Sequence, residues 1–185
     1  VNTKVPEHPS ICIQGNITEK RRNLDIDYLD WLCNMGFHIN VVGRSLKEES
    51  SHIIRHCHEK IGKEKITFYT RPGIGLAYSE LFEVIKSSNY LLSSISTADY
   101  FSGKITSTVN ISQATNIPII LATSSPLSLD NFLGCVYGIP YVDYETLREN
   151  DPKYLSSIHK DLQTYKILKM RENERQLKKI ISRFK

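Results

Sequence analysis

Short apolar runs rich in β-branched residues recur along this chain at intervals of roughly 25 residues. Each run is followed by a polar or glycine-containing loop, which is the pattern of a strand buried on both faces of a sheet. We predict strands at residues 11–14, 37–42, 66–69, 90–93, 117–121 and, with a weaker pattern, 139–142.

Segments with helical spacing separate these runs. Apolar residues at this spacing cover 26–33 and 76–85, and weaker patterns cover 49–61 and 105–114. Alternating strands and helices require crossover connections, which are right-handed and make the strands parallel. The pattern therefore predicts an α/β fold, with a doubly wound, mostly parallel, six-stranded Rossmann-like sheet, helices on both faces and C-terminal helices.

The last part of the chain has a different pattern. A long helical stretch begins near Asp151–Pro152, and its apolar face is Tyr154, Leu155, Ile158, Leu162, Tyr165 and Leu168. Beyond it, only Leu177, Ile180, Ile181 and Phe184 continue an apolar stripe. We expect an N-terminal tail at 1–9, a Rossmann-like domain at 10–150, and a helical extension at 151–185 that packs on the same domain.

The charge is concentrated in that extension. The whole chain has a formal net charge of +4, whereas residues 166–185 hold eight Lys or Arg against two Glu, so the remaining residues carry −2. The predicted domain therefore lacks the basic surface of a nucleic-acid-binding protein, and we expect no nucleic acid partner. A helix with a solvated basic face is the favoured interpretation, and contact with a membrane surface or a protein partner is the less favoured one.

Other features exclude several classes of protein. No apolar run is long enough to span a membrane, and the first residues lack the apolar region of a secretory signal. The cysteines Cys12, Cys33, Cys57 and Cys135 form no Cys-x-x-Cys pair, which indicates buried, reduced thiols and a cytoplasmic protein. On a helix His52 and His56 share a face but His58 points elsewhere, and no carboxylate or cysteine completes a tetrahedral ligand set, so we expect no metal.

Candidate binding residues follow the predicted strands, because ligands of an open parallel sheet bind beyond the carboxyl ends of its strands. After the first strand, Gly15 allows a tight turn or a close approach to a ligand, and Arg21 and Arg22 offer positive charge to a phosphate or simply lie in solvent. After the third strand, residues 71–75 form a stiff loop that contains Arg71 and Gly73.

The loop after the fourth strand is rich in hydroxyls and leads into a predicted helix. Its Lys104, Thr106 and Ser107 combine a cation and hydroxyls with the free N–H groups of a helix N-terminus, which together suit a phosphate. The alternative is that these side chains only cap the helix and meet solvent. No Gly-x-Gly-x-x-Gly fingerprint, P-loop or nucleophile elbow is present, and the pattern singles out no catalytic residue.

Several of these stretches resemble the C-terminal, donor-binding half of GT-B glycosyltransferases, over roughly residues 10–150. The stretches are 13–17 (Ile-Gln-Gly-Asn-Ile), 20–23 (Lys-Arg-Arg-Asn), 41–44 (Val-Val-Gly-Arg), 100–107 (Tyr-Phe-Ser-Gly-Lys-Ile-Thr-Ser) and 116–120 (Asn-Ile-Pro-Ile-Ile). Retaining members of this family carry a pair of glutamates in this region, and those positions hold Gly103 and Ile111 here.

The resemblance implies that a nucleoside-diphosphate sugar lies across the carboxyl edge of the sheet. Gly15 with Arg21 or Arg22 would border the diphosphate or the sugar, and Arg71 to Gly75 would hold the base. In the 100–107 stretch Tyr100 would belong to the donor site, and Lys104, Thr106 and Ser107 would bind phosphate. The family generally needs no metal or further cofactor.

The function implied is that of a glycosyltransferase donor domain acting in polysaccharide biosynthesis, with a glycan or other hydroxyl compound as acceptor. An N-terminal acceptor domain or a partner chain would complete the enzyme. The alternative is a non-enzymatic Rossmann-like module that senses a nucleotide or docks a protein through its basic C-terminal helix. Deletion of residues 170–185 discriminates between the two, since it would abolish partner binding and leave nucleotide affinity intact.

Overall fold

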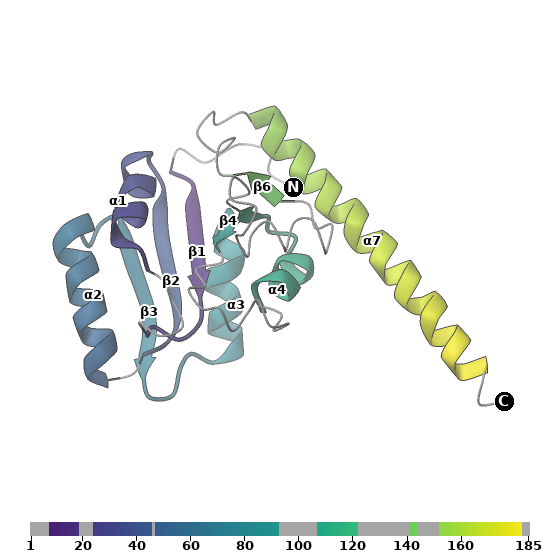
Figure 1. The fold of residues 1–185 in the computed structure, drawn as a ribbon, viewed down its shortest axis with the longest axis horizontal. Helices are drawn as coiled ribbons and strands as arrows, with labels where there is room; N and C mark the ends of the chain where they lie inside the picture. The colour runs from purple at the N-terminus through teal and green to yellow at the C-terminus, as the bar shows by residue number, and fades with distance from the viewer. Residues whose placement is uncertain are drawn as a thin grey trace.

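The computed structural model describes residues 8–18, 24–45, 47–92, 107–121, 141–143 and 152–182. Strands and helices alternate along it (Figure 1). The elements are β1 (Ser10–Gln14), α1 (Ile26–Asn34), β2 (His38–Ser45), α2 (Lys47–Ile61), β3 (Ile66–Pro72), α3 (Tyr78–Ser87), β4 (Tyr90–Leu92), α4 (Ser107–Thr115), β5 (Ile119–Leu121), β6 (Tyr141–Asp143) and α7 (Pro152–Ser182).

The strands form one sheet in the order β3-β2-β1-β4-β5-β6, and every neighbouring pair is parallel. β6 adds three residues beside β5 at the edge. Because the chain proceeds outward from β1 to β3 and then in the opposite direction from β4, the order reverses between β1 and β4. The predicted α/β fold with a parallel, Rossmann-like sheet is confirmed.

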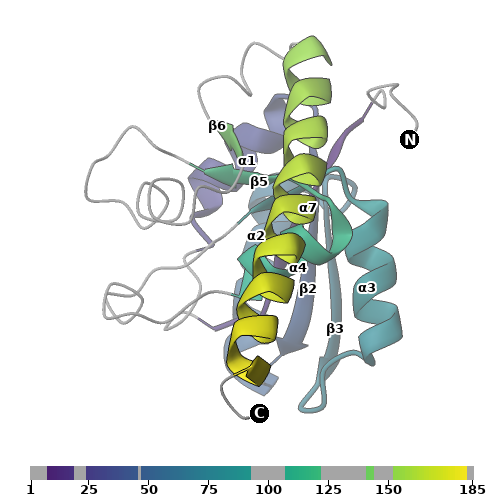
Figure 2. The ribbon, with the colours of Figure 1, turned by 90° about the vertical axis from the view of Figure 1, so that its right-hand side faces the viewer.

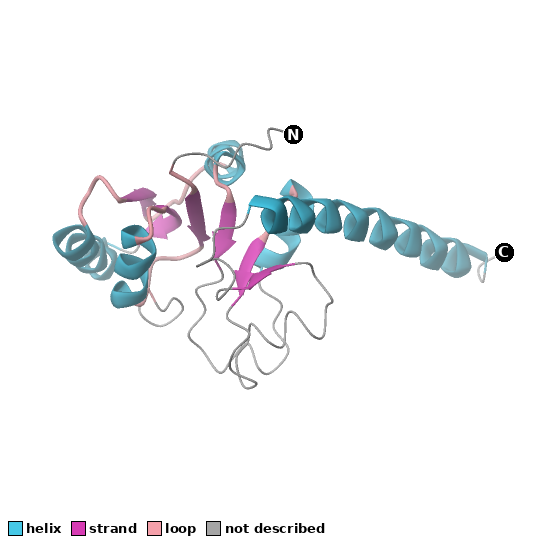
Figure 3. Ribbon diagram, turned by 90° about the horizontal axis from the view of Figure 1, so that it is seen from above, coloured by secondary structure: helices cyan, strands magenta, loops and turns pink. Residues whose placement is uncertain are grey.

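Helices cover both faces of this sheet (Figure 3). α1 and α2 lie on one face against β2 and β3, whereas α3 and α4 lie on the other face. Central strands such as β1 and β4 therefore carry consecutive buried apolar residues, since alternate side chains point to opposite faces and both faces are covered. In β1, Ile11 and Ile13 belong to the core under α1 and α2, and Cys12 belongs to the core under α3 and α4.

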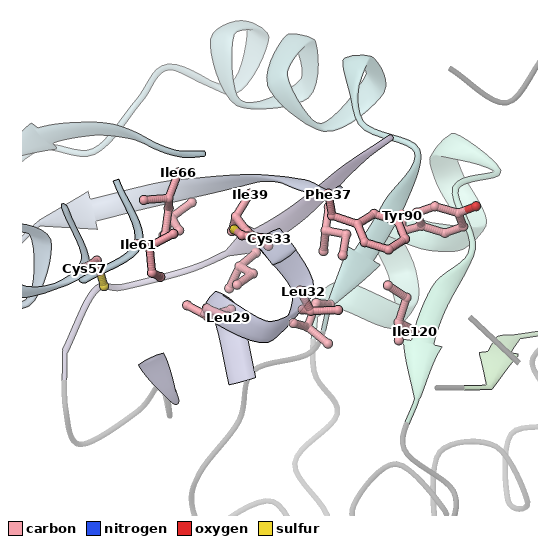
Figure 4. Packing of buried hydrophobic residues seen from close by; sticks show 14 of the residues in the cluster. Leu29, Leu32, Cys33, Phe37, Ile39, Cys57, Ile61, Ile66, Tyr90 and Ile120 are labelled. Atoms are coloured by element: carbon pink, nitrogen blue, oxygen red, sulfur yellow. The ribbon is translucent and has the colours of Figure 1, made fainter. Parts of the chain in front are cut away.

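Among the described residues, the core under α1 and α2 is the larger of the two. Figure 4 shows part of it. Leu29 and Leu32 of α1 pack into it beside Ile39 of β2 and Ile66 of β3, and all four are almost completely buried. These are the apolar positions from which the sequence predicts α1 and its neighbouring strands. The Asp25 side chain caps α1 by accepting a hydrogen bond from the Tyr28 N–H.

Among the described residues, the first half of α7 contacts the domain. Ile158 reaches one core and Leu162 the other, whereas from Ile167 to Ser182 every described residue is exposed except the half-buried Glu172. This second half of the helix points away from the sheet (Figures 1 and 2). None of the described helices combines the length and the apolarity needed to cross a membrane.

The buried thiols yield a prediction about reactivity. Burial raises the pKa of both Cys33 and Cys57 from 9.0 to about 11. At pH 8 the reactive thiolate form should therefore be about a hundredfold less populated than in the unfolded chain. In a Cys135→Ser variant, Ellman's reagent should label the native protein only in step with its unfolding in guanidinium. Labelling of the folded protein at the rate of the unfolded chain would contradict this placement.

Candidate functional site

The candidate site begins in the segment that directly follows β1 and continues alongside β2. The Gly15 N–H donates to the Val42 carbonyl at 2.9 Å, and the Ile17 N–H donates to the Arg44 carbonyl at 3.0 Å. Gly15 has φ +126°, a backbone conformation that side chains rarely adopt. Gly15 was expected to turn the chain or approach a ligand, and the structure gives it a close approach to Gly43.

Gly43 has no room for a side chain. A Cβ atom at this position would overlap the Gly15 carbonyl oxygen and would lie 2.6 Å from the Gly15 carbonyl carbon. The atoms nearest to this position belong to the backbone of Gly15, so the added atom cannot be accommodated by the movement of a flexible side chain. The pair of glycines thus sets how closely the loop after β1 lies to the end of β2.

A buried amide connects β1 to the start of α4. Gln14 is 5% exposed, and its Nε2 donates to the Ser107 Oγ at 3.1 Å and the Thr108 Oγ1 at 3.3 Å. These bonds fix the N-terminus of α4 beside Gly15, between the strands where the order of the sheet reverses. Sequence reasoning missed the roles of Gln14 and Thr108. The available signal was a single amide at the end of an otherwise apolar strand.

The loop after β3 joins the same edge of the sheet. The Gly73 N–H donates to the Ser45 carbonyl at 3.1 Å, and both Gly73 and Gly75 have positive φ. The guanidinium of Arg71 forms an ion pair with Glu80 of α3 at 2.5 Å. Arg71 is therefore held in place by an acid that the sequence analysis did not single out.

Two large side chains of this region are exposed to solvent. Ile74 is 88% exposed in the loop, and Tyr78 is 81% exposed at the first position of α3. An exposed aromatic ring beyond the carboxyl edge of a sheet can stack on a planar ligand, because every nucleotide base offers such a face. The only sequence signal for Tyr78 is an aromatic residue at the start of a helix.

A surface hollow of about 560 Å³ lies where β2 and β3 end beside the first turns of α2. It is lined by Ser45, Thr70, Glu48, Ser51, His52, Ile54 and Arg55. His52 and His56 of α2 stack with their rings 6.4 Å apart. Within the described ranges, no three His, Cys, Asp or Glu side chains gather as a metal site would require.

Buried polar atoms in the described ranges nearly all have hydrogen-bond partners. The exceptions are the Thr18 Oγ1, in the segment that follows β1, and the Asn116 Oδ1, after α4. An unpaired buried hydroxyl is uncommon in folded proteins. Thr18 stands three positions before Arg21, the first of the two predicted phosphate ligands Arg21 and Arg22.

The residues predicted from the sequence fall into two groups. Gly15, Arg71, Gly73 and Ser107 all lie at the carboxyl edge of the sheet, as expected. Ser107 is linked to the end of β1 by Gln14, whereas Arg71 lies two strands away on β3. The other predicted ligands lie outside the described residues, and they are Arg21, Arg22, Tyr100, Lys104 and Thr106.

A parallel sheet of this strand order, with a polar carboxyl edge at its point of reversal, defines a Rossmann-like α/β domain. No protein-family model and no curated protein matches the chain in sequence. The chain is similar to a solved structure of the Candida albicans trehalose-6-phosphate phosphatase N-terminal domain, with 12% sequence identity and a TM-score of 0.51. That similarity covers 87% of this chain and 39% of the other chain.

A second solved structure, the apo form of the lipopolysaccharide outer core galactosyltransferase WaaB, is 11% identical with a TM-score of 0.49. It covers 91% of this chain and 52% of that chain. The chain thus spans about half or less of the length of these two proteins. At 12% identity, the first of these similarities shows a common type of fold, and the activity has to be argued from the site.

Proposed function

We propose that the domain binds a nucleoside-diphosphate sugar at the carboxyl edge of its sheet and forms the donor-binding part of a GT-B type glycosyltransferase. The observation that carries this proposal is the pair of hydrogen bonds from Gln14 to Ser107 and Thr108. They hold a helix N-terminus against a glycine turn at the reversal of strand order, which is the arrangement that suits a diphosphate.

The charge of the diphosphate is matched by groups of known chemistry. A helix N-terminus offers N–H groups that are not used within the helix, and the helix dipole places partial positive charge there, so the start of α4 would favour an anion. Lys104 and Thr106 precede α4 in the sequence and would add a cation and a hydroxyl. Gly15 would let the phosphate approach the backbone, and Arg21 or Arg22 would contribute further charge.

The base of the nucleotide would lie near the carboxyl end of β3. The loop that follows β3 and contains Gly73 and Ile74 is hydrogen-bonded to the end of β2, and Tyr78 exposes its ring beside it. Neighbouring strands are about 4.8 Å apart, so the β3 loop lies about 10 Å from the end of β1. A nucleotide could therefore extend from a diphosphate at α4 to a base against Tyr78.

In this proposal the domain binds the nucleoside diphosphate, which is the leaving group of the reaction. The bond between the anomeric carbon and the phosphate oxygen breaks, and its electron pair leaves with the nucleoside diphosphate. The acceptor hydroxyl forms the new bond to the anomeric carbon and gives up its proton to a base outside the described residues. Lys104 and the N-terminus of α4 would stabilise the departing diphosphate without a metal ion.

Ligand-observed NMR with UDP, GDP, ADP and CMP, each with and without magnesium, tests the proposal. We expect one nucleoside diphosphate to bind equally well with and without the metal. Silence across the panel with the folded protein would contradict nucleotide binding by this domain.

Lys104→Ala should weaken the binding of that nucleotide about 5- to 150-fold, as the loss of a charge-assisted hydrogen bond of roughly 1–3 kcal/mol would. Titration calorimetry of both proteins measures the effect. Lys86→Ala is the matched control, because Lys86 is exposed in the last turn of α3, at the opposite edge of the sheet. Equal affinities of the Lys104 variant and the native protein would remove Lys104 from the site.

A further inference from the structure

The outer half of α7, residues 167–182, extends from the domain as a single exposed helix (Figures 1 and 3). At 1.5 Å per residue it is about 24 Å long. Six large apolar side chains along it are between 50% and 58% exposed, and they are Ile167, Leu168, Met170, Leu177, Ile180 and Ile181. This many exposed apolar side chains on one helix indicate a surface that binds a partner or a membrane.

These side chains are arranged with a helical period. At 100° per residue, Met170, Leu177, Ile180 and Ile181 fall within one arc of about 100°, the width of the apolar stripe of an amphipathic helix. Leu168 falls on the opposite side of the helix. We call the four residues of this arc the apolar arc of α7.

Basic residues outnumber acidic residues around the apolar arc. The outer half of α7 contains five basic residues, Lys169, Arg171, Arg175, Lys178 and Lys179, against two acids, Glu172 and Glu174. Lys169 borders the apolar arc on one side. On the other side Glu174 comes first and Lys178 follows it, and the remaining basic residues lie further round the helix. Glu172 is hydrogen-bonded to Arg175 and Gln176, so its charge is partly compensated within the helix.

These two properties select the partner. A second copy of the chain would bring the same positive charge to the apolar arc, and like charges oppose that pairing. Nucleic acid would satisfy the basic residues and leave the apolar arc in water. The headgroup region of an anionic bilayer satisfies both, because apolar side chains enter the acyl boundary while Lys and Arg reach the lipid phosphates.

We propose that the outer half of α7 binds to the surface of anionic membranes, with the apolar arc towards the acyl chains and the basic residues in the headgroup layer. The helix lies along the membrane surface and does not cross it. The proposal does not rest on nucleotide binding, since the apolar arc and the carboxyl edge of the sheet consist of different residues.

Sedimentation of the full chain with vesicles tests this. Vesicles that contain phosphatidylserine should bind the protein, vesicles of phosphatidylcholine alone should bind it weakly, and high salt should release it. Lys178→Gln with Lys179→Gln should weaken the binding about fivefold for each charge removed. No binding to anionic vesicles at low salt would overturn the proposal.

A matched pair of variants separates insertion from attraction by charge alone. Leu177→Ser should weaken binding to anionic vesicles about tenfold. Leu168→Ser removes an equally exposed leucine from the opposite side of the helix and should leave binding unchanged. Both positions are exposed, so the domain should remain folded, which circular dichroism checks. Equal losses in the two variants, or none in either, would overturn the proposal.

The oligomeric state provides a further test. Analytical ultracentrifugation of the chain without vesicles should show a monomer. A dimer that Leu177→Ser dissociates and Leu168→Ser does not would show that a second copy covers the apolar arc, and would overturn the membrane proposal.

Discussion

Replacing Gly43 by alanine should lower the free energy of unfolding by about 3 kcal/mol or more, which is a large part of the stability of a typical domain. The added Cβ would overlap the carbonyl oxygen of Gly15, which directly follows β1, and Gly43 lies in β2, the strand paired with β1. Relief requires β1 and β2 to separate at their carboxyl ends, which breaks the hydrogen bonds of Gly15 and Ile17.

Gly36→Ala is the matched control for this substitution. Gly36 has φ +93°, but a Cβ atom at this position would have no neighbour within 4 Å. Gly36→Ala should therefore lower the free energy of unfolding by only about 1–2 kcal/mol, the conformational strain of a left-handed residue. Urea unfolding followed by circular dichroism measures both variants. If Gly43→Ala proves no more destabilising than Gly36→Ala, the close approach of the two backbones does not exist in solution.

Gln14→Ala should have two separate effects. Removal of a buried amide that makes two hydrogen bonds should lower the free energy of unfolding by about 1–3 kcal/mol. It should also weaken nucleotide binding at least about tenfold, because the N-terminus of α4 would no longer be held against the end of β1. Denaturant unfolding and titration calorimetry measure the two effects on the same sample.

Asn40→Ala is the control that separates them. Asn40 is also a buried amide, and its Nδ2 donates to the Ser88 Oγ at 3.2 Å. Ser88 follows the C-terminal end of α3, which is the end further from the candidate site. Asn40→Ala should lose a similar stability and keep its nucleotide affinity. If both variants lose affinity in proportion to their stability, Gln14 acts on the fold alone, and the proposed role of the α4 N-terminus fails.

The sequence predicted the sheet because each strand is a short apolar run and each helix an apolar stripe of different period. Residues 11–13, for example, read as an uninterrupted Ile-Cys-Ile run, which only a strand covered on both faces can bury. The parallel arrangement followed from the alternation of strand and helix. The same reasoning placed Gly15, Arg71, Gly73 and Ser107 at the carboxyl edge.

What these residues contact could not be predicted in the same way. Gln14 and Ser107 are 93 positions apart in the chain, and no local pattern pairs them. The sequence predicted that Arg71 contacts a ligand, whereas in the structure its guanidinium forms an ion pair with Glu80, in the first turn of α3. Such contacts depend on how two elements are brought together, and the hydrophobic pattern specifies only which face of each element is buried.

The C-terminal helix shows the same division. The sequence by itself predicted a long helical stretch from about Asp151–Pro152, apolar positions that continue to its end and positive charge concentrated there, and the structure has a helix at Pro152–Ser182. Only the tertiary structure decided that Ile158 and Leu162 are buried while the apolar arc of α7 is exposed. The physical reason is that a helical stripe marks a face for burial, and burial itself requires a second surface within reach.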